Sequence, residues 1–155
     1  TNPPIVIKHI GDSRVYHFSA MTKTWRCITR DHNLLNQLID EKAENENRQA
    51  DFSKYNREGM AGPLYALTDC LIADSDLDNN PMPTFDSQTL KVSSDDCLVV
   101  CTDGVHDLVP CDKWQSIDKH TDLQAWLKQL RKQIYASEGR AYDNATAILV
   151  RFDEH

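Results

Sequence analysis

Long apolar runs, clusters of basic residues and paired-cysteine motifs are all missing from this 155-residue sequence. Because a transmembrane helix needs about 20 consecutive apolar residues, we expect no membrane contact and no signal peptide, and hence a cytoplasmic protein. Because no Lys/Arg cluster is present and the formal net charge is −7, we expect no nucleic-acid partner, since phosphate groups need cations opposite them. This acidity instead favours the binding of divalent cations.

Cysteine usage excludes two further kinds of site. No CxxC pair occurs, so the sequence predicts no zinc site. Cys97 and Cys101 would lie about 13 Å apart on one extended strand, which is too far for a disulfide between them. We therefore expect reduced, mostly buried thiols at the five cysteine positions, 27, 70, 97, 101 and 111.

Apolar periodicity predicts six strands and two helices. The strands are expected at 5–10, 14–19, 25–29, 87–92, 97–102 and 145–152. One helix should begin at a cap, either Asp31 or Asn33, with a polar tail to about Ser53. The other helix spans 122–135 with one apolar stripe, and an acidic loop is expected at 74–86. Grouped strands with helices between them predict an α+β domain with mainly antiparallel sheets.

The stretch "LVVCTDGVHDLV", residues 98–109, suggests a metal ligand at the end of a buried strand. Asp103 follows the strand directly and lies beside the core, where an unpaired carboxylate is costly. Gly104 has no Cβ, so the chain can bend there or another group can approach closely. If a helical turn follows, Asp103 and Asp107 share one face, and two neighbouring carboxylates repel unless a cation or a proton lies between them.

Two more aspartates have the same setting. Asp12, in "IGDSRVY", and Asp143, in "YDNATAILV", lie at strand edges beside small or turn-forming residues. Because strand ends of a layered domain meet at one rim, the four aspartates are expected to be able to form one site. Oxygen-only ligands favour Mg²⁺, Mn²⁺ or Ca²⁺ over zinc or copper. Each aspartate alone can also be a turn former or a helix cap, and this alternative stays open.

Four motifs occur in order along the chain: "GDSRVY", "TRDH", "CTDGVHD", and "DNAT" followed by an apolar strand. In this order the sequence resembles metal-dependent serine/threonine protein phosphatases of the protein phosphatase 2C (PPM) type, in particular the compact bacterial members. The resemblance implies the α-β-β-α layered sandwich of that family. It also implies a phosphoprotein substrate and two to three Mn²⁺ or Mg²⁺ ions in the complete domain, which activate a water for attack on phosphorus.

Carried over by position, the resemblance implies that Asp103 and Asp143 are ligands of the first metal. Asp12 and Asp107 resemble the residues that, together with Asp103, form an accessory third-metal site in bacterial relatives. Gly104 belongs to the same motif and is expected beside the bound ion. No side chain of this chain is expected to be catalytic in its own right.

The family's N-terminal Asp-Gly motif, whose aspartate bridges two metals, does not occur in these residues. We therefore expect residues 1–155 to be the C-terminal portion of a phosphatase domain, with the N-terminal half of that domain as its partner. The resemblance is thin between about 41 and 60. In addition, "ALTDCL" replaces an Ala-Leu-Gly that relatives often carry near the substrate.

Two other functions remain open. A catalytically inactive phosphatase-like module that binds a phosphoprotein or another partner would keep the same motifs, and so would a phosphohydrolase of small molecules. Ser13 and Arg14 are expected to hold a turn, and His32 and His106 are expected to be structural or solvated. The stretch "DSDLDNN", 74–80, resembles the start of a calcium loop but lacks the required glycine and glutamate, so a solvated acidic loop is predicted.

Overall fold

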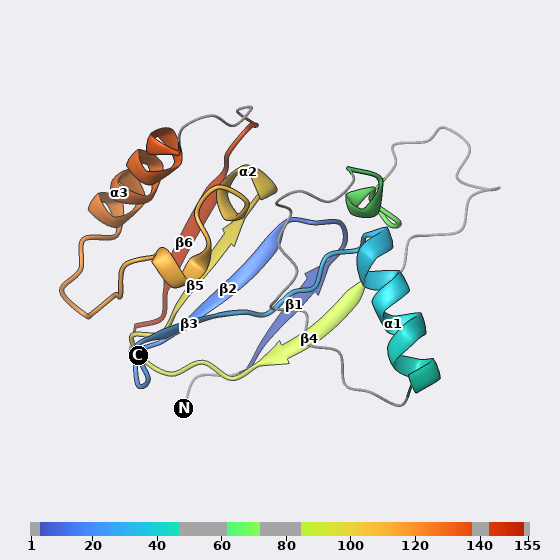
Figure 1. The fold of residues 1–155 in the computed structure, drawn as a ribbon. Coiled ribbons are helices and arrows are strands. Elements are labelled where there is room, and N and C mark those ends of the chain that lie inside the picture. The colour runs from blue at the N-terminus through green and yellow to red at the C-terminus, as the bar shows by residue number, and fades with distance from the viewer. Residues whose placement is uncertain (1–3, 47–61, 72–84, 138–142, 154–155) are drawn as a thin grey trace. The chain divides into compact units, whose positions relative to one another are not determined.

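The computed structural model describes residues 4–46, 62–71, 85–137 and 143–153 (Figure 1). Its strands are β1 (Ile5–His9), β2 (Arg14–Ser19), β3 (Thr24–Cys27), β4 (Asp86–Leu90), β5 (Cys97–Cys101) and β6 (Ala147–Arg151). Its helices are α1 (Leu34–Glu46), η2 (Gly62–Tyr65), α2 (Asp103–His106), η3 (Cys111–Lys113) and α3 (Leu123–Ala136), where η denotes a 3-10 helix. Every predicted strand and both predicted helices are present, while the acidic stretch at 74–84, with its calcium-loop alternative, lies outside the described residues.

The chain forms two compact units. The first unit consists of Thr1–Ile7, Ser13–Arg30 and Ser87–His155, and the second consists of Lys8–Asp12 and Asp31–Asp86. Three of the predicted metal ligands, Asp103, Asp107 and Asp143, belong to the first unit, whereas Asp12 belongs to the second.

The first unit is built on a four-stranded antiparallel sheet in the order β3-β2-β5-β6. Its register places Tyr16 opposite Val99 and Arg14 opposite Cys101 on the two central strands. On its other side β5 pairs with β6, where Cys101 lies opposite Ala147. The continuous apolar run of β5 is thus explained by its inner position, and β1 and β4 pair in a separate two-stranded sheet.

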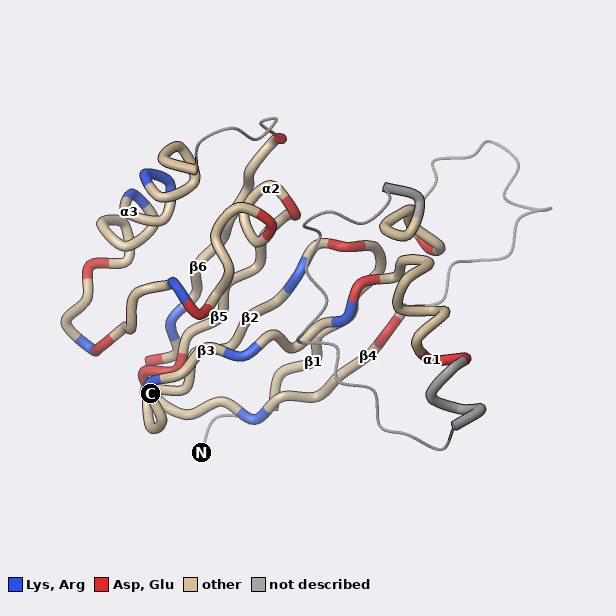
Figure 2. Tube along the Cα trace, in the orientation of Figure 1, with Lys and Arg blue, Asp and Glu red and all other residues tan. Residues whose placement is uncertain are grey.

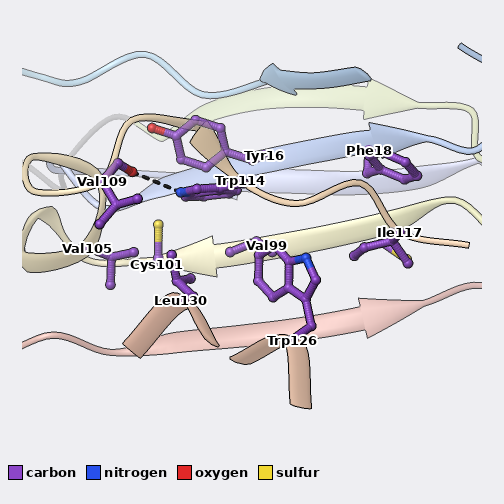
Figure 3. Close-up of a cluster of buried hydrophobic side chains, with 11 residues drawn as sticks. Tyr16, Phe18, Val99, Cys101, Val105, Val109, Trp114, Ile117, Trp126 and Leu130 are labelled. Carbon is purple, nitrogen blue, oxygen red and sulfur yellow. Dashed lines mark hydrogen bonds between the residues drawn. The ribbon is translucent and has the colours of Figure 1, made fainter. Parts of the chain in front are cut away.

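An aromatic core lies between one face of the four-stranded sheet and α3 (Figure 3). Alternation along β2 turns Tyr16 and Phe18 toward this core. Three tryptophans meet there: the ring of Trp25 lies 5.2 Å from that of Trp114 and 5.5 Å from that of Trp126. Aromatic rings bury large apolar areas, so this cluster is a major source of stability for the unit.

The segment before α3 is tied to the aromatic core by indole hydrogen bonds. The Nε1–H groups of Trp25 and Trp126 both donate to the carbonyl oxygen of Gln115, at 3.1 and 3.0 Å. Trp114 donates to the carbonyl oxygen of Val109 at 2.9 Å. Each indole N–H therefore has the partner that a buried polar group requires.

The opposite face of the four-stranded sheet packs on the two-stranded sheet. Val15 and Leu98 are buried together with Leu90 of β4, and Ile5 and Ile7 of β1 pack against them. The first unit thus has three layers, namely α3, the four-stranded sheet and the two-stranded sheet. These layers correspond to the α-β-β part of the expected sandwich.

Both longer helices begin after a capping side chain, and for α1 the cap is one of the two residues that the sequence predicts. Asp122 Oδ1 accepts hydrogen bonds from the amides of Gln124 and Ala125 at the start of α3. Of the two candidate caps of α1, the structure uses Asn33, whose Oδ1 accepts from the Asn36 amide at 2.9 Å.

In the described part of the chain, no helix has the length and apolar content needed to cross a membrane.

None of the five cysteines is in a disulfide bond. Burial raises the pKa of the Cys101 thiol to about 12 and also raises the pKa of Cys97 and Cys111. These three thiols therefore stay protonated at neutral pH and pack as small apolar side chains. Cys27 and Cys70 are exposed, so the expectation of mostly buried thiols is wrong for these two.

The carboxylate of Asp96 ties the turn before β5 to β2. Asp96 is 4% exposed, accepts hydrogen bonds from the amides of Ser93 and Ala20 at 2.9 and 2.8 Å, and lies 3.0 Å from His17 Nε2. Burial by itself raises the pKa of this carboxyl, but the hydrogen bonds from Ser93, Ala20 and His17 outweigh burial, so the pKa of Asp96 lies below its usual value. Ionisation of Asp96 is therefore coupled to folding.

Replacing Asp96 with alanine should lower the free energy of unfolding by about 3 kcal/mol, because two backbone amides and the buried His17 lose their acceptor. Urea unfolding at neutral pH measures this loss. Because the folded pKa of Asp96 lies below the unfolded one, its contribution is fully present above the unfolded pKa and is lost as the pH falls through the folded pKa.

Asp112→Ala is the matched control, because it removes an exposed carboxylate from η3. It should change the free energy of unfolding by less than about 0.5 kcal/mol. Equal effects of the two substitutions would contradict the structural role of Asp96.

Candidate metal centre

Asp103 lies where β5 ends and α2 begins. Thr102 occupies the N-cap position of α2 in an extended conformation, with φ −80° and ψ 167°. The carbonyl oxygen of Asp103 accepts a hydrogen bond from the Asp107 amide at 3.0 Å, which closes one helical turn. The side chains of Asp103 and Asp107 therefore share a helix face, as their spacing predicts. Figure 2 shows acidic positions at α2 and where the chain enters β6.

The segment that carries Asp143 is hydrogen-bonded to Thr102, at the junction of β5 and α2. The Thr102 amide donates to the carbonyl oxygen of Thr146 at 3.1 Å. The Thr102 hydroxyl donates to the carbonyl oxygen of Asn144 at 3.2 Å and accepts from the Thr146 amide at 3.1 Å. These bonds, which we call the Thr102 bridge, continue the β5–β6 pairing past the strand ends and bring the backbone segments of Asp103 and Asp143 together.

Gly104 allows the two segments to approach this closely. A Cβ atom on residue 104 would lie 2.7 Å from the carbonyl oxygen of Asn144 and 3.0 Å from its carbonyl carbon. Real Cβ atoms essentially never make contacts as short as the first, so a larger residue must push the segments apart. The close approach expected at Gly104 is confirmed, and the approaching group is the Asn144 backbone, whereas contact with a bound ion stays a prediction.

Each of the two aspartates has one carboxylate oxygen oriented by a backbone amide. Asp103 Oδ1 accepts from the Gly104 amide at 2.8 Å, and Asp143 Oδ1 accepts from the Asn144 amide at 2.7 Å. Asp103 is half-buried and Asp143 is exposed. Carboxylates held in this way are suited to hard cations such as Mn²⁺ and Mg²⁺.

The four predicted ligands are divided between the units. Asp103, Asp107 and Asp143 lie in the first unit, and Asp12 follows a turn in the second unit, where Gly11 has φ +95°. Their joint role as metal ligands therefore stays a prediction.

His106 lies between the two aspartates of the α2 turn in the sequence. Its side chain is 0% exposed, and its Nδ1 lies 3.1 Å from Asp107 Oδ1. A fully buried ring beside its neighbour's carboxylate fits the structural role expected for His106 better than proton transfer to a substrate.

A second cluster of potential ligands lies in the second unit. His9, His32 and Asp86 each offer one atom, and these atoms lie within 4.8 Å of one another, a grouping that no predicted aspartate joins among the described residues. The sequence predicts a structural or solvated role for His32 and no role for His9 or Asp86. Residues so far apart in the sequence come together only in the folded chain, where β1 and β4 pair. The local signal was modest: each histidine is in or beside a motif, "GDSR" or "TRDH".

Comparisons with known proteins find similar sequences and similar folds. The chain is 29% identical over 156 residues to a Mycoplasma genitalium protein named "Putative protein phosphatase", and the match covers 99% of this chain and 53% of that protein. The serine/threonine phosphatase of S. agalactiae superimposes with a TM-score of 0.67 at 21% identity, covering 99% of this chain and 55% of that one. The Mycobacterium tuberculosis phosphatase PstP/Ppp gives a TM-score of 0.61 at 19% identity, covering 97% and 56%. No protein-family model matches the chain.

The fold is therefore that of the PPM-type, protein phosphatase 2C-like serine/threonine phosphatases, with antiparallel sheets. The chain is a relative of these phosphatases and spans about half the length of the relatives it matches. A PstP catalytic domain of the same fold was solved in complex with 2 manganese ions, with a TM-score of 0.60 at 19% identity, covering 99% of this chain and 56% of that one. The expected similarity to these phosphatases and the expected fold class are confirmed.

Replacing Gly104 with alanine should lower the free energy of unfolding by about 2 kcal/mol, because the added methyl group overlaps the Asn144 carbonyl. Hydrogen exchange at the Thr102 and Thr146 amides should become faster, since their bonds cross the point of overlap. Denaturant unfolding and amide exchange measure the two effects. An alanine variant with the stability and amide protection of the parent would contradict the close approach.

Proposed function

We propose that this chain is part of a Mn²⁺- or Mg²⁺-dependent phosphatase that hydrolyses phosphoserine and phosphothreonine in proteins. One observation carries the proposal: in a fold of the PPM type, the Thr102 bridge holds the backbone segments of Asp103 and Asp143 side by side. The proposed substrate class follows the names of the relatives, which are serine/threonine phosphatases.

The donor set fits the proposed ions. Asp103 and Asp143 would hold the first ion through carboxylates whose orientation is set by neighbouring backbone amides. Asp107, one helical turn from Asp103, and Asp12 would serve an accessory ion. When bound, the ions supply a water that loses its proton near neutral pH, and they neutralise charge on the phosphoryl oxygens. Carboxylate oxygens suit Mn²⁺ and Mg²⁺, and the manganese complex of PstP supports manganese.

The partner that we propose is the complementary part of a phosphatase domain. An exposed apolar face supports this: Val100, Ile148 and Val150 are 41%, 59% and 43% exposed, on the face of β5 and β6 that points away from α3. Within the described residues, β6 also has β5 as its single neighbouring strand. Exposed apolar side chains beside an open strand edge are typical of a surface that another segment covers.

The test is a chimera in which this chain replaces the matching region of the Mycoplasma genitalium relative. With Mn²⁺ present, we expect the chimera to hydrolyse p-nitrophenyl phosphate and a phosphothreonine peptide, and we expect EDTA to stop this hydrolysis. This chain alone should hydrolyse neither substrate. Asp103→Asn and Asp143→Asn should each lower turnover by at least about a hundredfold, because a neutral amide is a poor ligand for a hard cation. In the chimera, hydrogen exchange at Ile148 and Val150 should also slow as their face becomes covered.

The matched control is Asp112→Asn in η3, which should keep the parental activity. Full activity in Asp103→Asn would contradict the ligand assignment. A folded chimera that binds Mn²⁺ without hydrolysing either substrate would favour the inactive binding module. Hydrolysis of the small ester alone would favour a phosphohydrolase of small molecules.

A further inference from the structure

The cluster of His9, His32 and Asp86 takes no part in the proposed metal centre, and its hydrogen bonds point to another role. The side chains of His32 and Asp86 are 15% and 51% exposed. The rings of His9 and His32 are stacked, with centroids 5.0 Å apart and an interplanar angle of 18°. All three residues belong to the second unit, so this geometry is internal to it.

His32 holds the turn at Gly11 through both its backbone and its ring. The Gly11 amide donates to His32 Nδ1 at 2.9 Å, and the His32 amide donates to the carbonyl oxygen of Gly11 at 2.9 Å. Gly11 has φ +95°, a conformation that residues with a Cβ atom adopt only with strain. The turn held in this way leads directly to Asp12.

The ring contacts of His32 define its tautomer. Because Nδ1 accepts a hydrogen bond from Gly11, a neutral ring carries its proton on Nε2. Nε2 lies 3.2 Å from Asp86 Oδ2, so its N–H has a carboxylate acceptor. In the other tautomer an Nδ1–H would face the Gly11 N–H and the Nε2 lone pair would face a carboxylate, and both contacts would be repulsive.

The same hydrogen bonds argue against a metal ion in this cluster. An ion bound at His32 Nε2 requires a neutral ring with its proton on Nδ1. Nδ1 is the atom to which Gly11 already donates. Metal binding would therefore break the bond that holds the turn.

We propose that Asp86 and His32 form a positioning pair for Asp12. Asp86 sets the tautomer of His32, His32 fixes the conformation of Gly11, and the fixed turn orients Asp12. The backbone of His32 is itself held in place, because its carbonyl oxygen accepts a hydrogen bond from the Thr68 amide at 3.0 Å. This inference rests on the proposed function only in making Asp12 a metal ligand.

Two substitutions separate the ring contacts of His32. In His32→Asn the side-chain oxygen occupies the position of Nδ1 and can accept from Gly11. In His32→Gln the amide group reaches the position of Nε2, so a donor to Asp86 is kept and the acceptor for Gly11 is lost. By NMR-detected exchange in the 155-residue chain, the Gly11 amide should exchange about five- to tenfold faster in the Gln variant and near the parental rate in the Asn variant.

Substitutions of Asp86 test the tautomer directly. The ¹⁵N shifts of His32 in the parent should show the Nε2–H form, and Asp86→Ala should increase the Nδ1–H form and speed exchange at Gly11. Asp86→Asn still offers an acceptor oxygen and should restore both properties. Ser87→Ala, at the exposed next residue of β4, should leave them unchanged.

The link to Asp12 is measured as Mn²⁺ affinity in the chimera, from paramagnetic broadening of the Asp12 amide signal. The Mn²⁺ concentration at half-maximal broadening should rise about tenfold in His32→Gln and stay near the parental value in His32→Asn. An unchanged Mn²⁺ affinity in His32→Gln, or no broadening at Asp12 in the parent, would overturn the positioning role.

Equal exchange of Gly11 in the Asn and Gln variants would also overturn the proposal, and so would stoichiometric Zn²⁺ binding that shifts the ring signals of both His9 and His32. Gly11 exchange is measured without metal. If the metal-ligand role proposed for Asp103 were disproved, the exchange rates of Gly11 would still be valid. The proposed function and the positioning pair can therefore be disproved independently.

Discussion

The close contact between Gly104 and the backbone of Asn144 is the constraint on which the proposed site depends. It lets the Thr102 bridge continue the pairing of β5 and β6 beyond the strands themselves. The segments of Asp103 and Asp143 are thereby placed together by the fold, so less conformational freedom has to be lost when a cation binds. A side chain at residue 104 would displace both segments at once. The stability of this part of the fold is therefore linked directly to the cation binding proposed for it.

β5 supports this part of the fold because it is held at both ends. At its start, the Asp96 carboxylate binds the turn to β2 through the Ala20 amide and His17. At its end, the Thr102 bridge joins the strand to the segment before β6. Between these points alternate side chains of β5 pack in the aromatic core, and Leu98 on the other face packs against the two-stranded sheet. A ligand carried at the end of such a strand is held more rigidly than one on a free loop.

Local patterns in the sequence were sufficient for the strands and for the α3 stripe, because alternation and spacing are local properties. The four aspartates were selected from their positions in the motifs, and their role as metal ligands stays a prediction. Other features depend on tertiary pairing and could not be predicted. Asp96 reads as a turn residue in "SSDD", yet the fold buries it against β2. His32 reads as part of a turn motif, and its contact with Asp86 exists only once the chain folds back through β4. Cys27 reads as a buried strand residue, but its strand lies at the sheet edge.

The most direct test of the account is to follow the amide signals of the isolated chain by NMR while Mn²⁺ is added. Paramagnetic broadening falls steeply with distance, so the signals that broaden first identify the ion's surroundings. We expect the signals of Asp103, Gly104 and Asn144 to broaden together at the lowest Mn²⁺ concentration and to recover when EDTA is added. Broadening that begins at His9 and His32, that reaches only one of the two bridged segments, or that reaches neither would contradict this expectation.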